Sequence, residues 1–197
     1  MKINIFTLIL SILIILLSIK IYSDSDFANL KCIISHLDGN TYCVRERNKL
    51  ELAADKLAKV NMNLKKLLDY CNIQFPDQEN VKLLVKNFNP KKITETLPTS
   101  KYTAYSENKG EKLAFCLNNK KNGNKLIDMN TLMYVALHEI SHIATKSVGH
   151  TDEFWQNFKF FIEQAAVINI YKPIDYKKTP AQYCGMDITD NPYFDIE

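Results

Sequence analysis

Two histidines and a glutamate stand at a spacing that suits metal-dependent hydrolysis: His138, Glu139 and His142 form the pattern H-E-x-x-H. Residues four apart on an α-helix lie on one face, so both imidazoles can bind one Zn²⁺, each nitrogen about 2.0–2.1 Å from the ion. Glu139 is turned about 100° around the helix from His138. Its carboxylate can therefore reach a zinc-bound water without acting as a ligand itself.

A third ligand is needed to complete such a site, and two residues could supply it. His150 follows His142 by eight residues and is favoured. Three imidazoles with a fourth position left to water make a catalytic zinc site. Glu163, twenty-one residues past His142, is the alternative, in the manner of sites built from two histidines and a glutamate. The remaining histidine, His36, is expected to be a polar surface residue.

Such a centre would hydrolyse peptide bonds. Glu139 would take a proton from the water as it attacks a carbonyl carbon, and would pass that proton to the leaving amine. The ion would polarise the carbonyl and stabilise the oxyanion. Several residues could orient the ligands or assist the oxyanion, and the sequence does not choose among them. They are the carboxylates Asp152, Glu153, Asp187 and Asp190 and the tyrosines Tyr134, Tyr171, Tyr176 and Tyr183.

Helix signals surround these residues. Asp128 or Asn130 is a suitable N-cap for the helix that carries the H-E-x-x-H pattern. Gly149 allows a sharp reversal just before His150. A further helix is then expected from the N-cap Thr151 to about residue 171. These elements would present all three histidines to one place.

The rest of the chain predicts an α+β fold. Apolar residues recur at helical spacing over 48–70 and 80–88, while Asp38-Gly39-Asn40 is a turn between two apolar runs. Residues 102–117 alternate like a pair of strands, and the tail 176–197 is expected to be mostly irregular. We therefore expect a small antiparallel or mixed sheet, packed on the H-E-x-x-H helix and further long helices.

The N-terminus predicts a membrane segment. Residues 3–21 are almost continuously apolar, and nineteen helical residues just span a bilayer core of about 30 Å. A retained anchor or signal-anchor over 1–22 is favoured over a cleaved signal peptide, because Ile21-Tyr22-Ser23 is a poor cleavage site. The chain would then be a single-pass protein of a host membrane, or of a virion membrane if it is viral, with secretion after cleavage as the second possibility. Lys2 and Lys20 nearly cancel, so the membrane orientation stays open.

Length and composition fit one domain with an appendage. We expect a mainly helical part with a short hairpin over 23–95 and a catalytic part over 96–197, which together form one compact domain. A net charge of +3 does not favour nucleic-acid binding. The five cysteines include no C-x-x-C pair for zinc, while Cys32 and Cys43 could close a small loop in an oxidising compartment.

The stretches 138–142 and 149–155 together resemble the zincin peptidases of the WLM and SprT-like groups. The resemblance implies a zincin-like fold, one zinc ion, His138, His142 and His150 as its ligands, and Glu139 as general base. More broadly, the chain resembles uncharacterised metallopeptidases of large eukaryotic DNA viruses, notably at residues 105–112 and 183–186.

These observations favour a membrane-anchored zinc metallopeptidase that acts on protein or peptide substrates. One alternative is a catalytically inactive, zinc-stabilised membrane or virion protein. A second alternative is a DNA-associated protease, since WLM and SprT-like proteins often cleave DNA-bound proteins. In zincins a strand beside the active helix commonly pairs with the substrate, and residues 113–117 are the predicted strand.

Overall fold

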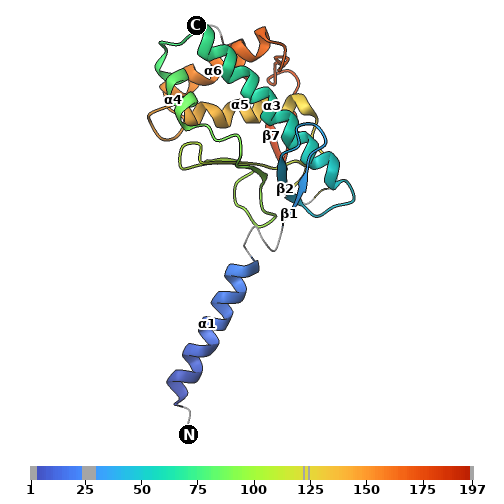
Figure 1. Ribbon diagram of the computed structural model, residues 1–197, viewed down its shortest axis with the longest axis vertical. Helices are drawn as coiled ribbons and strands as arrows, with labels where there is room; N and C mark the ends of the chain where they lie inside the picture. Colours follow the sequence, from blue (N-terminus) through green and yellow to red (C-terminus); the bar gives the residue numbers. More distant parts are fainter. Residues whose placement is uncertain (1–3, 24–29, 122, 124, 196–197) are drawn as a thin grey trace.

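The computed structural model describes residues 4–23, 30–121, 123 and 125–195 and has the predicted α+β architecture. One helix stands apart from the other elements, and the remaining helices gather beside a mixed sheet (Figure 1). The helices are α1 (Ile5–Ser23), α3 (Leu50–Gln74), α4 (Glu79–Asn87), α5 (Met129–Ile143), α6 (Asp152–Val167) and the 3-10 helix η1 (Pro192–Phe194). The strands are β1 (Leu30–Ile34), β2 (Thr41–Arg45), β3 (Ile93–Glu95), β4 (Ala104–Glu107), β5 (Lys112–Phe115), β6 (Ala181–Tyr183) and β7 (Met186–Ile188).

The main sheet has five strands in the order β1-β2-β3-β5-β4. The outer pairs β1–β2 and β4–β5 are antiparallel hairpins, while β3 runs parallel to both β2 and β5. The first hairpin turns where the sequence predicts it, with Gly39 at φ +70°. Strand β5 is therefore an inner strand, and β4 is the edge on that side.

This order corrects one prediction. Residues 113–117 were expected to offer a free edge to substrate, but β3 and β4 occupy both edges of β5. The alternation of residues 102–117 correctly indicates two strands, yet it carries no information on their outer partners. Strand β3 has only three residues, too few to show a period in the sequence.

Helix α5 lies in the core of the molecule. Its N-cap is Asp128, whose carboxylate accepts the backbone N–H of Thr131 at 2.9 Å. Helices α3, α4 and α6 and strand β4 pack around it. Eleven of its fifteen residues are buried, among them Glu139 and Ser141. A helix surrounded in this way holds its side chains in fixed positions.

Helix α3 contributes the other large apolar face. Its predicted range is extended by four residues at the C-terminal end, because Cys71 still packs in the core. The buried face repeats at helical spacing. Its members are Ala53, Ala54, Leu57, Ala58, Val60, Asn61, Leu64, Leu67 and Cys71. The core that they join runs as one cluster from Tyr42 to Cys184, across the predicted division between residues 95 and 96.

Helix α6 begins as predicted and ends early. The Thr151 hydroxyl caps it by accepting the backbone N–H of Phe154. The helix ends at Val167 rather than near residue 171, because Asn169 adopts φ +58° and the N–H of Ile170 turns back to the Ala165 carbonyl. The left-handed residue closes the last turn.

The tail is more ordered than predicted. Residues 181–188 form the hairpin β6–β7, with Cys184 and Gly185 at positive φ in its turn. A disulfide joins Cys184 to Cys116, and another joins Cys32 to Cys43 across the β1–β2 hairpin. The tail is thereby tied to the end of β5.

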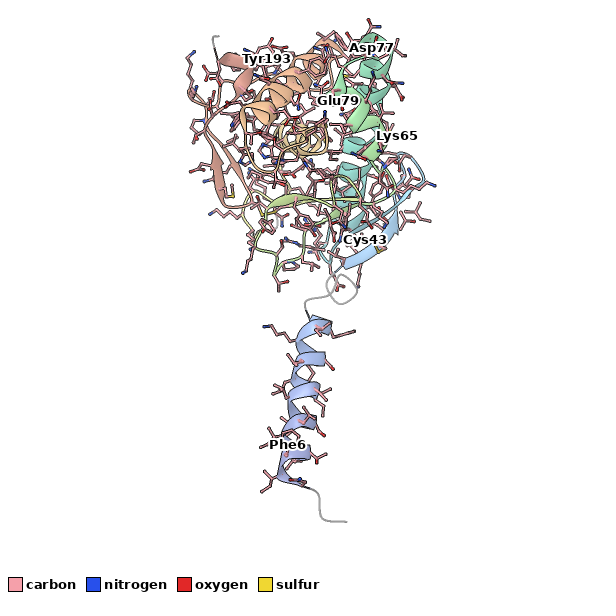
Figure 2. All side chains as sticks on the ribbon, turned by 90° about the vertical axis from the view of Figure 1, so that its left-hand side faces the viewer. Phe6, Cys43, Lys65, Asp77, Glu79 and Tyr193 are labelled. Atoms are coloured by element: carbon pink, nitrogen blue, oxygen red, sulfur yellow. A yellow bond between two sulfur atoms is a disulfide. The ribbon has the colours of Figure 1, made fainter. Side chains whose placement is uncertain are left out.

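Helix α1 makes no core contact within the described chain. The candidate span Ile5–Tyr22 is apolar and wholly exposed, and its side chains project outward on all sides (Figure 2). Its length and composition suit a membrane span, and they suit a signal sequence equally.

Candidate active site

The structure brings together the three histidines that the sequence predicts as zinc ligands. His138 and His142 project from one face of α5, with ring centroids 5.0 Å apart. His150 reaches them from the loop between α5 and α6. One ligand nitrogen from each imidazole lies within 4.8 Å of the others.

The spacing of these nitrogens fits a zinc ion. Ligands at about 2.0–2.1 Å in a tetrahedron are separated from one another by about 3.3 Å. The Nε2 atoms of His138 and His150 are 3.1 Å apart. Within the part of the chain that the structure describes, the cluster holds three histidines and no carboxylate, so Glu163 is not a member. Three ligands leave the fourth position of a tetrahedral ion open.

Aromatic side chains of α6 fix the orientation of the imidazoles. Phe154 stacks on His142 with ring centroids 4.3 Å apart, and its ring is 4.9 Å from His138 and 4.8 Å from His150. Trp155 lies 5.7 Å from His150 on the outer side. The Phe-Trp pair at the start of α6 therefore packs directly on the histidines.

Burial keeps the imidazoles of His138 and His142 neutral. Desolvation lowers the pKa of His138 to about 3, and the neighbouring His142 and His150 lower it further. The pKa of His142 falls to about 4 through desolvation, with contributions from His150 and from the ammonium of Lys109. Both rings are thus unprotonated at neutral pH, and their lone pairs are available to a cation.

Glu139 lies beside the histidines and is 6% exposed. Burial raises the pKa of its carboxyl to about 8, against a hydrogen bond from the backbone of Ser106 on β4 that lowers it. A carboxylate whose pKa lies near neutrality can both accept and release a proton. Ser106 is a site residue that the sequence analysis missed.

A cavity of about 800 Å³ opens over these groups. Its floor is formed by the three histidines and Glu139. Its wall is β4 together with the loop before it, and it includes Tyr102 and Tyr105. Since β4 pairs only with β5 in the described chain, its other side faces this cavity.

The four tyrosines proposed to assist the oxyanion do not line the cavity. Tyr134 packs against Tyr171 and Tyr176, and its hydroxyl donates to the Asp190 carbonyl at 2.7 Å. The Tyr183 hydroxyl is hydrogen-bonded to the Thr103 carbonyl and to the Cys116 N–H. Tyr102 and Tyr105 were missed because their sequence gives no sign of which side of β4 faces the histidines.

The remaining predicted residues lie in other places. His36 is largely exposed, 4.0 Å from Glu51. Asp190 pairs with Lys177, and Asp152 and Asp187 are exposed. Only Glu153 among the four carboxylates contacts the loop that carries His150.

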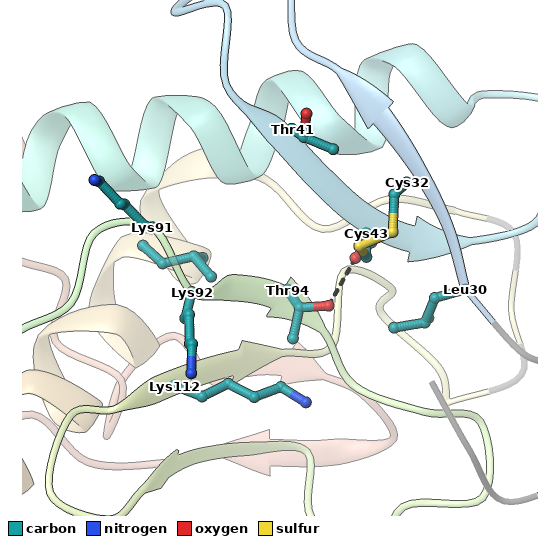
Figure 3. A pocket seen from close by; sticks show the side chains of 9 residues that line it. Leu30, Cys32, Thr41, Cys43, Lys91, Lys92, Thr94 and Lys112 are labelled. Atoms are coloured by element: carbon teal, nitrogen blue, oxygen red, sulfur yellow. Dashed lines mark hydrogen bonds between the residues drawn. A yellow bond between two sulfur atoms is a disulfide. The ribbon is translucent and has the colours of Figure 1, made fainter. Parts of the chain in front are cut away.

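A second cavity, of about 590 Å³, lies beside the Cys32–Cys43 disulfide. Lys91, Lys92 and Lys112 surround it, and the Thr94 hydroxyl donates to the Cys43 carbonyl at 2.9 Å (Figure 3). Its nine lining residues include no imidazole and no carboxylate. The histidine cavity, by contrast, is lined by side chains that could bind a metal or transfer a proton.

Uncharacterised viral proteins are similar to the chain in sequence. An uncharacterised protein, R325 of Acanthamoeba polyphaga mimivirus, is 35% identical over 183 residues, which is 91% of this chain and 90% of R325. The chain belongs to the R325 family. Protein 136R of Invertebrate iridescent virus 6 is 32% identical over 75 residues, 38% of this chain and 41% of its own length. Protein 042R of Invertebrate iridescent virus 3 is 36% identical over 59 residues, 30% of this chain and 36% of its own.

Solved structures show the same fold elsewhere, although no protein-family model matches the chain. Wss1 from Saccharomyces cerevisiae superposes with a TM-score of 0.50 over 64% of this chain and 87% of the solved Wss1 chain, at 16% identity. A Wss1 mutant gives the same score over 88% of its length. The match to Wss1 supports the expected WLM-like fold. The similarity to R325 confirms the expected resemblance to proteins of large DNA viruses.

Proposed function

We propose that this chain is a zinc-dependent metallopeptidase that hydrolyses peptide bonds in protein substrates. One observation carries the proposal: three imidazoles converge beside a buried carboxylate at the floor of an open cavity. The fold shared with Wss1, a zinc metalloprotease of the WLM group, supports it. At 16% identity that likeness concerns the fold alone, so the chemistry rests on the residues of this chain.

His138, His142 and His150 would hold one zinc ion, because their donor set and nitrogen spacing fit it. When bound, zinc supplies a Lewis acid that polarises a carbonyl and makes water more acidic. The stacked ring of Phe154 keeps the imidazoles oriented toward the common centre. Glu163 would play no part in binding.

Glu139 would move the proton. A carboxylate oxygen of Glu139 accepts it from the attacking water and delivers it to the nitrogen of the leaving amine. The hydrogen bond from the backbone of Ser106 directs the carboxylate. The adjacency of Glu139 to His138 in the sequence puts the base beside the reacting carbonyl.

Strand β4 would bind the substrate. An extended peptide can add to an edge strand through main-chain hydrogen bonds. Ala104–Glu107 has such an edge, and it borders the cavity that holds the histidines. This strand replaces residues 113–117 in the proposal. Recognition through the backbone accepts many sequences, which suits protein substrates.

Neither alternative has an observation of its own in its favour. A site with a purely structural role would normally close the fourth position with a protein ligand. The described cluster instead has three ligands with Glu139 beside them. A DNA-associated protease would be expected to have a strongly basic surface, which a net charge of +3 does not indicate. We further propose that α1 anchors the domain in a membrane as a single span.

The direct test is Glu139→Gln in the full chain, purified in detergent and loaded with zinc. Cleavage of an unfolded protein should fall by a factor of roughly 100 to 10,000, the usual contribution of a general base. Zinc content should stay at one ion per chain, because Glu139 is not a ligand. Glu163→Gln is the matched control and should cleave like the wild type.

Two results would contradict the proposal. Undiminished cleavage by Glu139→Gln would show that Glu139 is not the general base. A folded wild-type protein that binds no zinc and cleaves no unfolded protein would show that the chain is not a zinc peptidase.

A further inference from the structure

The loop that carries His150 has little packing at its tip, residues 146–149. It joins the end of α5 to the start of α6 at residues 144–151. Val148 at its tip is 88% exposed, and Gly149 adopts φ +86° with open space around it. Apolar contacts therefore do not fix residues 146–149, although the position of the third imidazole depends on them.

One polar clamp comes from Lys109. Its Nζ donates to the carbonyls of Thr145 at 2.6 Å, Ser147 at 2.8 Å and Lys146 at 3.2 Å. These carbonyls follow the C-terminus of α5, where the helix dipole favours a positive charge. The ammonium thus holds three successive peptide groups of the loop.

Lys109 itself is placed by a rigid turn. It lies between β4 and β5 at φ +56°, next to Gly110 at φ +112°. A Cβ at Gly110 would lie 2.6 Å from the Asn87 carbonyl oxygen, so the turn packs closely against the end of α4. Only glycine permits this approach. The clamp therefore extends from a fixed support.

A second clamp grips the opposite side of the same peptides. The carboxylate of Glu153, in the first turn of α6, accepts the N–H of Lys146 at 3.0 Å and that of Ser147 at 3.2 Å. It also accepts the Ser147 hydroxyl at 2.8 Å. Lys109 donates to the carbonyls and Glu153 accepts from the amides, three to five residues before His150.

We infer that Lys109 and Glu153 are positioning residues of the metal site, which act by fixing the loop so that His150 meets His138 and His142. The inference rests on the proposed zinc function. His138 and His142 need no such help, since α5 alone sets their spacing. His150 is the one ligand whose place depends on a loop, and the two clamps hold the part of that loop that precedes it.

Removing Lys109 would change the zinc affinity in opposite directions, depending on whether Lys109 positions the loop or only repels the ion. The Lys109 charge is close enough to His142 to disfavour a second cation. Removing that charge would by itself tighten zinc binding. If Lys109 acts by holding the loop, its removal weakens zinc binding instead, and only while His150 is present.

The experiment measures zinc affinity by chelator competition on the full chain in detergent. Lys109→Met and Glu153→Gln are each made in the wild type and in His150→Ala. In the wild-type background each should weaken zinc binding roughly 10-fold to 100-fold, as loss of a supporting contact does. In the His150→Ala background neither should weaken it. Lys66→Met is the matched control, because Lys66 donates to a carbonyl at the end of α6, away from the site, and it should bind zinc like the wild type.

Equal weakening in both backgrounds, or no weakening with His150 present, would overturn the inference. Circular dichroism of the zinc-free proteins shows whether each variant folds, and if Lys109→Met does not, Glu153→Gln decides alone. The absorption bands of bound Co²⁺ give a second readout, expected to shift toward those of His150→Ala. A wild type that binds no zinc would instead refute the proposed function.

Discussion

At the scale of residues, the histidine cluster depends on aromatic packing as well as on spacing. Phe154 is fully buried, and its ring lies within 5 Å of all three imidazoles. It excludes water from the rings of His138 and His142, which is one cause of their lowered pKa values. The same contact connects α6 to α5.

Phe154→Ala should therefore lower the free energy of unfolding of the zinc-free protein by about 3–5 kcal/mol, the usual cost of deleting a buried phenyl ring. Trp155→Ala is the control on the next residue, which is 41% exposed, and it should cost about 1 kcal/mol. Denaturant titration followed by circular dichroism measures both. A smaller loss for Phe154→Ala than for Trp155→Ala would show that this packing is not what holds the site.

The sequence predicts part of the site because part of it is local. His138, Glu139 and His142 lie on one helix, so their spacing alone indicates how they meet. His150 was favoured over Glu163, and the structure gathers His150. Ser106, Tyr105 and Lys109 could not be found in this way, because they reach the site through the register of β4 and the turn after it.

At the scale of elements, the helices were easier to predict than the strands. Ranges 48–70 and 80–88 match α3 and α4 to within a few residues, since each shows several turns of apolar spacing. Strand β3 has three residues and β5 has four, so neither is long enough for its sequence to indicate which strands it pairs with. The short tail hairpin was missed for the same reason. The Cys184-Gly185 pair, which forms its turn, was the sequence feature that could have indicated it.

That tail hairpin is held by a long-range crosslink. Cys116 and Cys184 are 68 residues apart, whereas Cys32 and Cys43 are 11 apart. On chain entropy, the larger loop stabilises the fold by about 4 kcal/mol and the smaller by about 3 kcal/mol. Through the Tyr183 hydroxyl, the larger loop also supports Thr103, which directly precedes strand β4 at the histidine cavity.

We accordingly expect the double variant Cys116→Ser/Cys184→Ser to lose more stability than Cys32→Ser/Cys43→Ser. Thermal unfolding of the two variants, both measured with zinc removed, gives the comparison. A smaller loss for the first pair would mean that the tail contributes little to the fold.

At the scale of the whole molecule, the apolar helix α1 and the disulfides both bear on which side of a membrane the domain lies. The sequence left the membrane orientation open, because its flanking lysines cancel. Four of the five cysteines pair in the structure, and the fifth, Cys71, is buried. Disulfides form and persist in oxidising compartments.

We therefore expect the domain to lie on the oxidising side of its membrane. Membranes denatured without reductant and treated with a polyethylene-glycol maleimide should gain one adduct per chain, at Cys71, and five after reduction. Protease added to the cytosolic face of sealed membranes should leave the domain intact. Five adducts without reductant, or a digested domain, would place it on the cytosolic side.

The central claim is that His138, His142 and His150 hold one zinc ion, and X-ray absorption at the zinc edge of the loaded full chain tests it most directly. We expect one zinc per chain with three imidazole nitrogens at about 2.0–2.1 Å and a water oxygen as the fourth ligand. The imidazole count should fall to two in His150→Ala and remain three in Glu163→Ala. Fewer than three imidazoles in the wild type, or a loss on removing Glu163 in place of His150, would contradict the account.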